Sequence, residues 1–356
     1  MATISAAEQL PAIPALRARR RIGWLAAAVL CVVGAASLGL FVGPVRLDPV
    51  DVLKRFLSFL PFVRDTSHLT ATQDAILMQI RLPRVVLAGL VGATLSISGG
   101  AYQGAFRNAL ADPYLLGAAA GAGLGATMVI VFTHAAAASS LIPIAAFAGA
   151  LIAVALAYAM GRAGSGGRTA TSLVLAGIAV MSFLTAVQTF LQQRKSDTLR
   201  EVYGWILGRL STAGWHDVLL ILPYTAAGAA VILAHRRLLD VLALGDEEAD
   251  ALGVNTRRVR LVVVIAASLS TAAAVAVSGL IGFVGIIVPH IIRLVAGTSY
   301  RVILPLCLAF GAAFLILCDL LGRTLIAPAE LPIGVVTAFF GAPFFAIVLR
   351  NSRKMI

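Results

Sequence analysis

The sequence predicts an all-α, polytopic membrane bundle of about ten transmembrane helices. Of its 356 residues, 60% are apolar and only 12% are charged, whereas soluble globular chains carry about 25% charged residues. The mean hydropathy is +0.96, and apolar runs close to the roughly 20 residues that cross a bilayer recur along the whole chain. No stretch between these runs is long enough for a soluble domain, so we expect a single membrane domain.

The apolar runs define the expected spans in order. The first follows the basic stretch 17–21 and is longer than the hydrophobic core of a cleaved signal peptide, so we expect it to be retained. The eighth is short and contains Pro289, which indicates a half-span or a tilted piece. The expected spans are 24–43, 85–106, 115–132, 141–160, 172–191, 218–234, 261–280, 283–294, 303–321 and 332–349.

The distribution of basic residues predicts the orientation. An even number of spans places both termini on one side, and cytoplasmic termini put most of the 28 Lys and Arg residues in inner segments, as the positive-inside rule requires. We therefore expect a bacterial inner-membrane protein with a cytoplasmic tail 1–22, a permease domain 23–350 and a cytoplasmic tail 351–356. The net charge of +12 then reflects basic loops in contact with the bilayer, and no nucleic-acid partner is expected.

Small residues are dense within the spans, as in 117–125. They let helix backbones approach closely, which predicts a tightly packed bundle. A weak internal similarity also relates Ser96-Ile-Ser98-Gly99 to Ala276-Val-Ser278-Gly279, near the ends of two spans that cross in opposite directions. Inverted repeats with broken helices are typical of transporters, although chance similarity explains four small residues equally well.

The chain lacks residues for enzymatic chemistry. It contains no Gly-x-x-x-x-Gly-Lys-Ser/Thr phosphate-binding loop, and its five histidines follow no metal-binding pattern. No set of residues suggests an intramembrane hydrolase. We therefore expect no catalytic residues, no metal ligands and no cofactor bound by this chain, and any ATP must be hydrolysed by another subunit.

The inner loop 240–258 is unusual in its charge. Four acidic residues stand between Gly245 and Gly253 and are followed by three arginines. Ala249, Leu252 and Val254 offer a small apolar face. Two interpretations fit this pattern equally well: a solvated acidic loop, or a short helix that docks into a groove on a partner.

Asp319 is the acidic residue that lies deepest within an expected span. Ionisable residues inside a membrane are costly to bury and are therefore functional candidates. Together with the inverted repeat, Asp319 would fit an ion-coupled secondary transporter. A single acid without a clear partner makes a poor proton relay, so this is the distant alternative.

Several ordered blocks between about Arg81 and Arg350 resemble the FecCD-type permease family, the membrane subunits of ABC importers for vitamin B12, haem and iron–siderophore complexes. The blocks are Arg81-Leu-Pro-Arg84, Gln103-Gly-Ala-Phe-Arg107-Asn108, Leu110-Ala-Asp112-Pro113-Tyr-Leu-Leu-Gly117, Leu175-Ala-Gly177-Ile, Trp205-Ile-Leu-Gly208, Leu244-Gly-Asp-Glu-Glu, Leu252-Gly253-Val-Asn, Gly282-Phe-Val-Gly-Ile-Ile-Val-Pro289-His290, Leu304-Pro305, Ala329-Glu330-Leu-Pro332-Ile-Gly334-Val-Val-Thr337 and Gly341-Ala-Pro343-Phe.

The resemblance implies roles for four groups of residues. The coupling helices that sit in a cleft of the ATPase would fall at Leu244, Gly245, Asp246, Glu247, Glu248, Ala249, Leu252, Gly253, Val254 and Asn255. Outer arginines that grip a substrate-binding protein would be Arg81, Arg84 and Arg323. The cytoplasmic gate would lie at Asn108 and Leu110, although Ala109 stands where the family usually has proline. Ile178, Ser182 and Thr337 would line the pathway.

The resemblance also implies partners and substrate. It implies a homodimer of permease chains with two ATPase subunits, which bind ATP and Mg²⁺, and a periplasmic or surface substrate-binding protein. The expected function is import of an iron complex, siderophore or haem, by alternating access. Cobalamin is the nearest alternative.

Overall fold

The computed structural model describes residues 13–133, 140–163, 170–208, 210–211 and 214–352, and within these ranges every regular element is a helix. The all-α prediction is therefore confirmed. In the described part of the chain, seven helices are long and apolar enough to cross a membrane, and three shorter apolar helices complete the ten expected spans.

The long spans are α1 (Ile13–Phe41), the continuous run of α3 (Ala71–Ala75), η1 (Ile76–Arg81) and α4 (Leu82–Phe106), then α6 (Leu141–Ala163), α7 (Ala170–Arg194), α9 (Trp215–Ala234), α12 (Thr256–Ser278) and α14 (Tyr300–Thr324). The shorter apolar helices are α5 (Ala118–Thr133), α13 (Val284–Ala296) and α15 (Ile333–Ser352). The connecting helices are α2 (Pro49–Leu57), η2 (Pro113–Leu116), η3 (Ser196–Thr198), α8 (Leu199–Ile206), α10 (Arg236–Leu242) and α11 (Asp246–Ala251).

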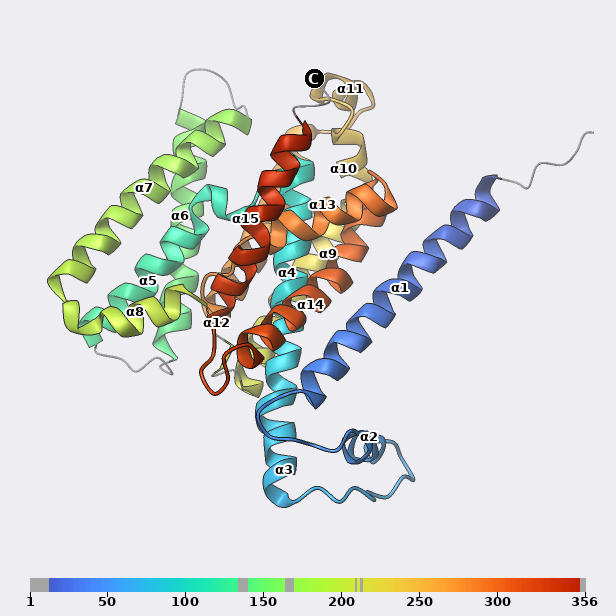
Figure 1. The fold of residues 1–356 in the computed structure, drawn as a ribbon. Coiled ribbons are helices and arrows are strands. Elements are labelled where there is room, and N and C mark those ends of the chain that lie inside the picture. The colour runs from blue at the N-terminus through green and yellow to red at the C-terminus, as the bar shows by residue number, and fades with distance from the viewer. Residues whose placement is uncertain (1–12, 134–139, 164–169, 209, 212–213, 353–356) are drawn as a thin grey trace, which may run out of the picture.

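Three helices form the centre of the bundle. The most apolar segments of α4, α12 and α14 are 61–83% buried, whereas those of α1, α6, α7 and α9 are only 17–28% buried. Figure 1 shows α4 in the middle of the molecule, with α1 on one side and α6 and α7 on the other. The exposed apolar faces of the outer helices are those that meet lipid in a membrane protein.

The two ends of the bundle carry different elements. The α11 end holds α10, α11 and the last turn of α15, and the α2 end holds α2 and α3 (Figure 1). Helix α1 starts towards the α11 end and finishes at the α2 end. Helix α1 begins at Ile13 and α15 continues to Ser352, so parts of the predicted tails 1–22 and 351–356 are helical, and their assignment as cytoplasmic tails stays a prediction. Residues 1–12 and 353–356 lie outside the described part of the chain.

The second span begins earlier than expected, and a proline explains its local geometry. A capping box at Thr70 starts the helix at Ala71, and the wider π turn η1 carries it into α4. Pro83 has no N–H and therefore cannot donate the next hydrogen bond of the π turn, to the carbonyl of Met78. The carbonyl of Met78 instead accepts a hydrogen bond from Trp215 Nε1 at 2.9 Å.

Glycines allow the central helices to touch along their backbones. A Cβ added at Gly92 of α4 would lie 2.2 Å from the Gly311 carbonyl oxygen of α14, and one at Gly121 of α5 would lie 2.2 Å from that of Gly149 on α6. The predicted close packing by small residues is therefore confirmed for these pairs. The inverted repeat stays a prediction.

Replacing Gly92 by alanine is expected to lower the free energy of unfolding by about 1–3 kcal/mol, because the backbones of α4 and α14 must separate. Gly34 on α1 is a matched control, since nothing lies within 4 Å of a Cβ added there. Thermal unfolding of the two variants in the same detergent measures the difference. Equal midpoints for G92A and G34A would show that the close approach contributes nothing.

Candidate transport pathway and coupling site

A non-helical break at residues 279–283 separates α12 from α13, the short eighth span. Helix α13 contains 13 residues, so at 1.5 Å per residue it covers about 20 Å of a hydrocarbon core roughly 30 Å thick. The prediction of a shortened eighth span is confirmed.

The protein satisfies the backbone of this non-helical segment. The Tyr114 hydroxyl donates to the Ile281 carbonyl at 3.1 Å and accepts from the Ile281 N–H at 3.3 Å. Gln103 Nε2 donates to the Gly285 carbonyl at 3.1 Å. Irregular backbone at membrane depth persists only where protein buries it or where it lines a cavity, and here both conditions are met.

The segment 279–283 forms one wall of an open groove of about 590 Å³. The end of α8 and one face of α15 form the other walls, and the Gly334 N–H donates to the Leu207 carbonyl at 3.0 Å to join these two elements. The lining residues are Ile206, Leu207, Leu280, Gly282, Phe283, Gly334, Val335, Ala338, Phe339, Ala342 and Pro343. None of these residues has a polar side chain, so the groove is suited to a large, weakly polar molecule.

A tryptophan at Ala338 is expected to reduce substrate uptake about tenfold or more, because the added ring fills the groove and raises the barrier to passage. Val29 on α1 is 60% exposed and does not line the groove. V29W is therefore the control for adding an indole ring elsewhere in the bundle. Uptake into liposomes measures both variants. Undiminished uptake by A338W would exclude the groove from the pathway.

The structure does not bring the three predicted pathway residues together. Ile178 is 43% exposed, and Ser182, one turn later on the same face of α7, donates its hydroxyl to the Ile178 carbonyl at 2.9 Å. Thr337 is fully buried, and its hydroxyl donates to the Gly334 carbonyl at 3.1 Å. Its neighbours Ala338 and Phe339 face the groove instead.

The acidic inner loop folds as the short helix α11, as the docking interpretation expected. Its apolar surface differs from the expected one, because Ala249 is fully buried and points into the chain. Leu244 and Leu252 flank the helix and are 63% and 64% exposed. Glu247 and Glu248 are also exposed, so the free surface of α11 combines two leucines with negative charge.

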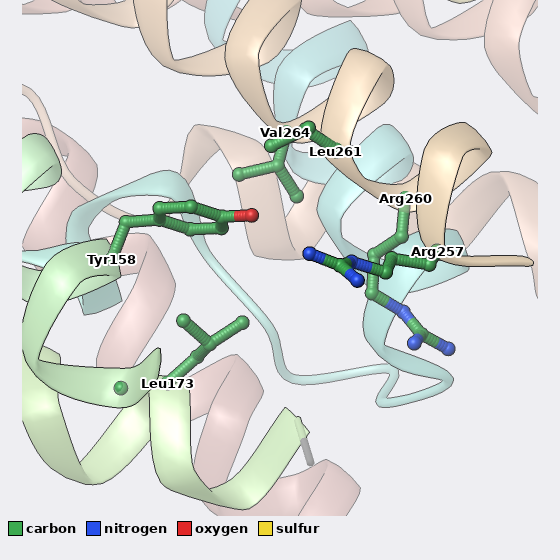
Figure 2. A pocket seen from close by; sticks show the side chains of 7 residues that line it. Tyr158, Leu173, Arg257, Arg260, Leu261 and Val264 are labelled. Atoms are coloured by element: carbon green, nitrogen blue, oxygen red, sulfur yellow. The ribbon is translucent and has the colours of Figure 1, made fainter. Parts of the chain in front are cut away.

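Arg260 connects α11 to the end of α4. Its Nε donates to the Ala105 carbonyl at 2.8 Å, and its Nη2 donates to Asp246 at 2.9 Å. Arg107 Nη2 lies 3.8 Å from the same Asp246 carboxylate. Figure 2 shows Arg257 and Arg260 at the start of α12, beside a small cavity shared with Tyr158 and Leu173.

The predicted gate residues lie in the loop that follows this connection. The Asn108 N–H donates to the Gln103 carbonyl at 3.1 Å, and the Asn108 side chain accepts from the Leu110 N–H at 2.9 Å. Arg260 and the end of α4 thus connect α11 to this loop through a series of direct hydrogen bonds. The gate itself stays a prediction.

A buried charged cluster holds the α2 end together. Arg84 donates from Nη2 to Asp319 at 2.9 Å and from Nη1 to Glu330 at 3.0 Å. The Arg84 and Asp319 side chains are 11% and 3% exposed, whereas Glu330 is 40% exposed. One arginine thus bridges two acids, one from α14 and one from the loop that follows it.

The other two predicted docking arginines are also engaged internally. Arg81 is 4% exposed and donates to the Leu40 carbonyl at 2.9 Å and to the Val45 carbonyl. Arg323 is 5% exposed and donates to the Gly39 carbonyl. Both side chains therefore bind the last turn of α1, and Arg81 also binds the segment after it. Their role in docking stays a prediction.

The cluster also explains Asp319. Its carboxylate accepts from Arg84 and lies 3.7 Å from Arg323 Nε. Asp319 is therefore part of a structural ion pair that links α14 to α4.

Comparison with known proteins identifies the family. The model of the FecCD transport family matches residues 29–351. The cobalamin import system permease protein BtuC of Halobacterium salinarum is 44% identical over 284 residues, which cover 79% of this chain and 74% of that protein. The hemin transport system permease protein HmuU of Yersinia pestis is 40% identical over 301 residues, which cover 80% of this chain and 87% of that protein.

The fold agrees with this relationship. A solved structure of a metal-chelate type ABC transporter in an inward-facing conformation superposes with a TM-score of 0.78 at 27% identity, covering 92% of this chain and 98% of the other. The groove, the broken span and the exposed helix α11 are thus features of a transport protein. The chain is a multi-pass membrane protein that belongs to the FecCD transport family of ABC permeases.

Proposed function

We propose that this permease imports a metal chelate across the bacterial inner membrane by alternating access, with both termini in the cytoplasm. The observation that supports this most strongly is the apolar groove beside the broken span at 279–283. Helices interrupted at membrane depth mark substrate sites in transporters. The concentration of arginines at the α11 end supports the cytoplasmic assignment of that end.

The substrate we propose is an iron complex, either a siderophore or haem. The groove is wide, lacks charged side chains and includes the aromatic rings of Phe283 and Phe339, which suits a large, rigid ligand with apolar surface. The relative from Yersinia pestis is a hemin permease. Cobalamin is the second candidate, because the relative from Halobacterium salinarum is a cobalamin permease.

A homodimer would close the pathway. The groove is open on one side, and large apolar residues beside it are exposed, among them Phe339 at 74% and Phe340 at 49%. A second chain related by a two-fold axis would cover these residues and join two grooves into one central passage. Ile178 and Ser182 on the exposed face of α7 would then reach the same passage.

Two further kinds of subunit complete the proposed importer. ATPase subunits would bind at α11 and hold ATP and Mg²⁺, because this chain contains no phosphate-binding loop. A substrate-binding protein would dock at the α2 end, near Arg81, Arg84 and Arg323. Since these arginines already have internal partners, docking through them would require an exchange of carboxylates, and such contacts weaken with salt.

Reconstitution in liposomes tests the function. The permease, its ATPase and its binding protein are assembled, and accumulation of radiolabelled hemin, a ferric siderophore and cobalamin is compared with and without internal ATP. We expect saturable, ATP-dependent accumulation of one class of chelate. Accumulation without ATP, or transport of none of the three classes, would contradict the proposal.

A further inference from the structure

A second open cavity lies at the α11 end, among α1, α10 and α14. Its volume is about 310 Å³. It is lined by three arginines from two helices and by a mainly apolar wall. The lining residues are Trp24, Leu25, Arg236, Arg237, Arg301, Val302, Pro305 and Leu306.

The cavity has an excess of positive charge. Arg301 Nε lies 3.5 Å from Asp240, but this carboxylate already accepts from the Ser299 hydroxyl at 2.8 Å and from the Tyr300 N–H at 2.6 Å. Arg236 and Arg237 form no ion pair with any residue in the described ranges. Of the three guanidinium groups, only that of Arg301 lies within ion-pair distance of a carboxylate in the described part of the chain, and the main partners of that carboxylate lie at the start of α14.

The position of Trp24 suits a cavity at the depth of lipid headgroups. Trp24 is half-buried against it and stands where the basic stretch 17–21 gives way to the apolar part of α1. Tryptophan concentrates at the membrane–water boundary. Further along α1, Val29 and Leu30 are 60% and 71% exposed, as expected of a helix whose outer face meets acyl chains.

We infer that this cavity binds the headgroup of an anionic phospholipid. Arg236, Arg237 and Arg301 would donate to the phosphate oxygens, and Leu25, Pro305 and Leu306 would contact the glycerol and the first acyl carbons. Basic pockets between membrane helices on the cytoplasmic side are suited to anionic headgroups. This site goes beyond the proposed transport function and does not depend on it.

The bound lipid would connect α1 to the coupling region. Helix α10 ends at Leu242, only a few residues before α11, and Asp240 of α10 caps the start of α14. A phosphate held by Arg236 and Arg237 would therefore hold α10 against α1. The lipid would act as a fixed support for the segment that leads into α11.

Fluorescence quenching of Trp24 tests the site. The full chain is placed in phosphatidylcholine nanodiscs and titrated with phosphatidylglycerol carrying brominated acyl chains, and the W24F variant defines the part of the quenching that comes from Trp24. We expect half-maximal quenching at a much lower mole fraction for brominated phosphatidylglycerol than for brominated phosphatidylcholine. R236Q/R237Q should weaken this binding roughly 25-fold, about fivefold for each arginine.

The control is R258Q/R350Q, which removes the same charge from exposed arginines at the α11 end that do not line this cavity. It should keep the preference for phosphatidylglycerol, and inorganic phosphate should not relieve the quenching. An equal loss in both double variants would mean diffuse attraction to the basic surface. Equal quenching by the two lipids, or displacement by inorganic phosphate, would likewise overturn the proposal.

Discussion

Replacing Arg84 by glutamine is expected to lower the free energy of unfolding by about 3–5 kcal/mol, because it leaves a buried carboxylate without its main partner. Asp319 is 3% exposed and accepts two hydrogen bonds from Arg84 Nε and Nη2 through Oδ1, at 3.0 and 2.9 Å. After the substitution, only Arg323 at 3.7 Å remains near this carboxylate. Reversible unfolding of the purified permease, without any binding protein, measures the loss.

Two further variants show whether the loss comes from the pair. R84Q/D319N should recover part of the stability, because it removes the buried carboxylate that R84Q leaves without its main partner, while Arg323 keeps its bond to the Gly39 carbonyl. R55Q removes an arginine that pairs with Asp74 at 2.6 Å in a more exposed setting, and it should cost less than about 1 kcal/mol. A loss in R84Q no larger than that in R55Q would mean that the cluster does not stabilise the α2 end.

Aspartates at Leu244 and Leu252 are expected to weaken binding of the ATPase at least about 100-fold. The two leucines are 63% and 64% exposed beside α11, and burying a leucine side chain stabilises a complex by roughly 1.5–3 kcal/mol, so loss of both exceeds the ~2.7 kcal/mol that corresponds to this factor. Affinity of the permease for its ATPase, measured by titration in detergent or nanodiscs, gives the result directly.

Leu53 provides the control for introducing an aspartate at an exposed leucine. It is 57% exposed on α2, at the opposite end of the bundle. L53D should bind the ATPase like the wild type. If L244D/L252D also binds like the wild type, the surface of α11 does not contact the ATPase and the coupling proposal loses its interface.

The main architecture could be predicted from the sequence because lipid imposes strong constraints on it. Length and hydropathy gave the spans, and dense small residues predicted the backbone contacts seen at Gly92 and Gly121. Glycines around four acids fitted a short helix and a solvated loop equally well, and the family resemblance favoured the helix that the structure shows. These signals are local, and each depends on only a few neighbouring residues.

The contacts between distant segments could not be predicted in this way. Arg84 and Asp319 are 235 positions apart, and no local pattern relates them. Three arginines next to spans look equally suitable for a partner or for the interior. Only the arrangement of α1, α4 and α14 shows that Arg81 and Arg323 bind the carbonyls at the end of α1.

The sequence also could not show which face of a strongly apolar or very short helix is buried. Helix α15 is apolar nearly all round, so its pattern does not show that Thr337 is buried while Ala338 and Phe339 line the groove. In α11, Ala249 was expected outside but is buried. A helix of six residues has too few turns for periodicity to define its inner face.

The most direct test of the account is ATP-driven uptake by the reconstituted importer, with E247K/E248K compared to the wild type. Glu247 and Glu248 are exposed on α11, so their reversal should leave the permease folded while ATP hydrolysis and uptake collapse together. D197K/E201K, a reversal of equal charge on exposed residues distant from α11, should keep the wild-type rate of hydrolysis. Uptake that proceeds without the ATPase, or that is indifferent to E247K/E248K, would contradict a permease driven through α11.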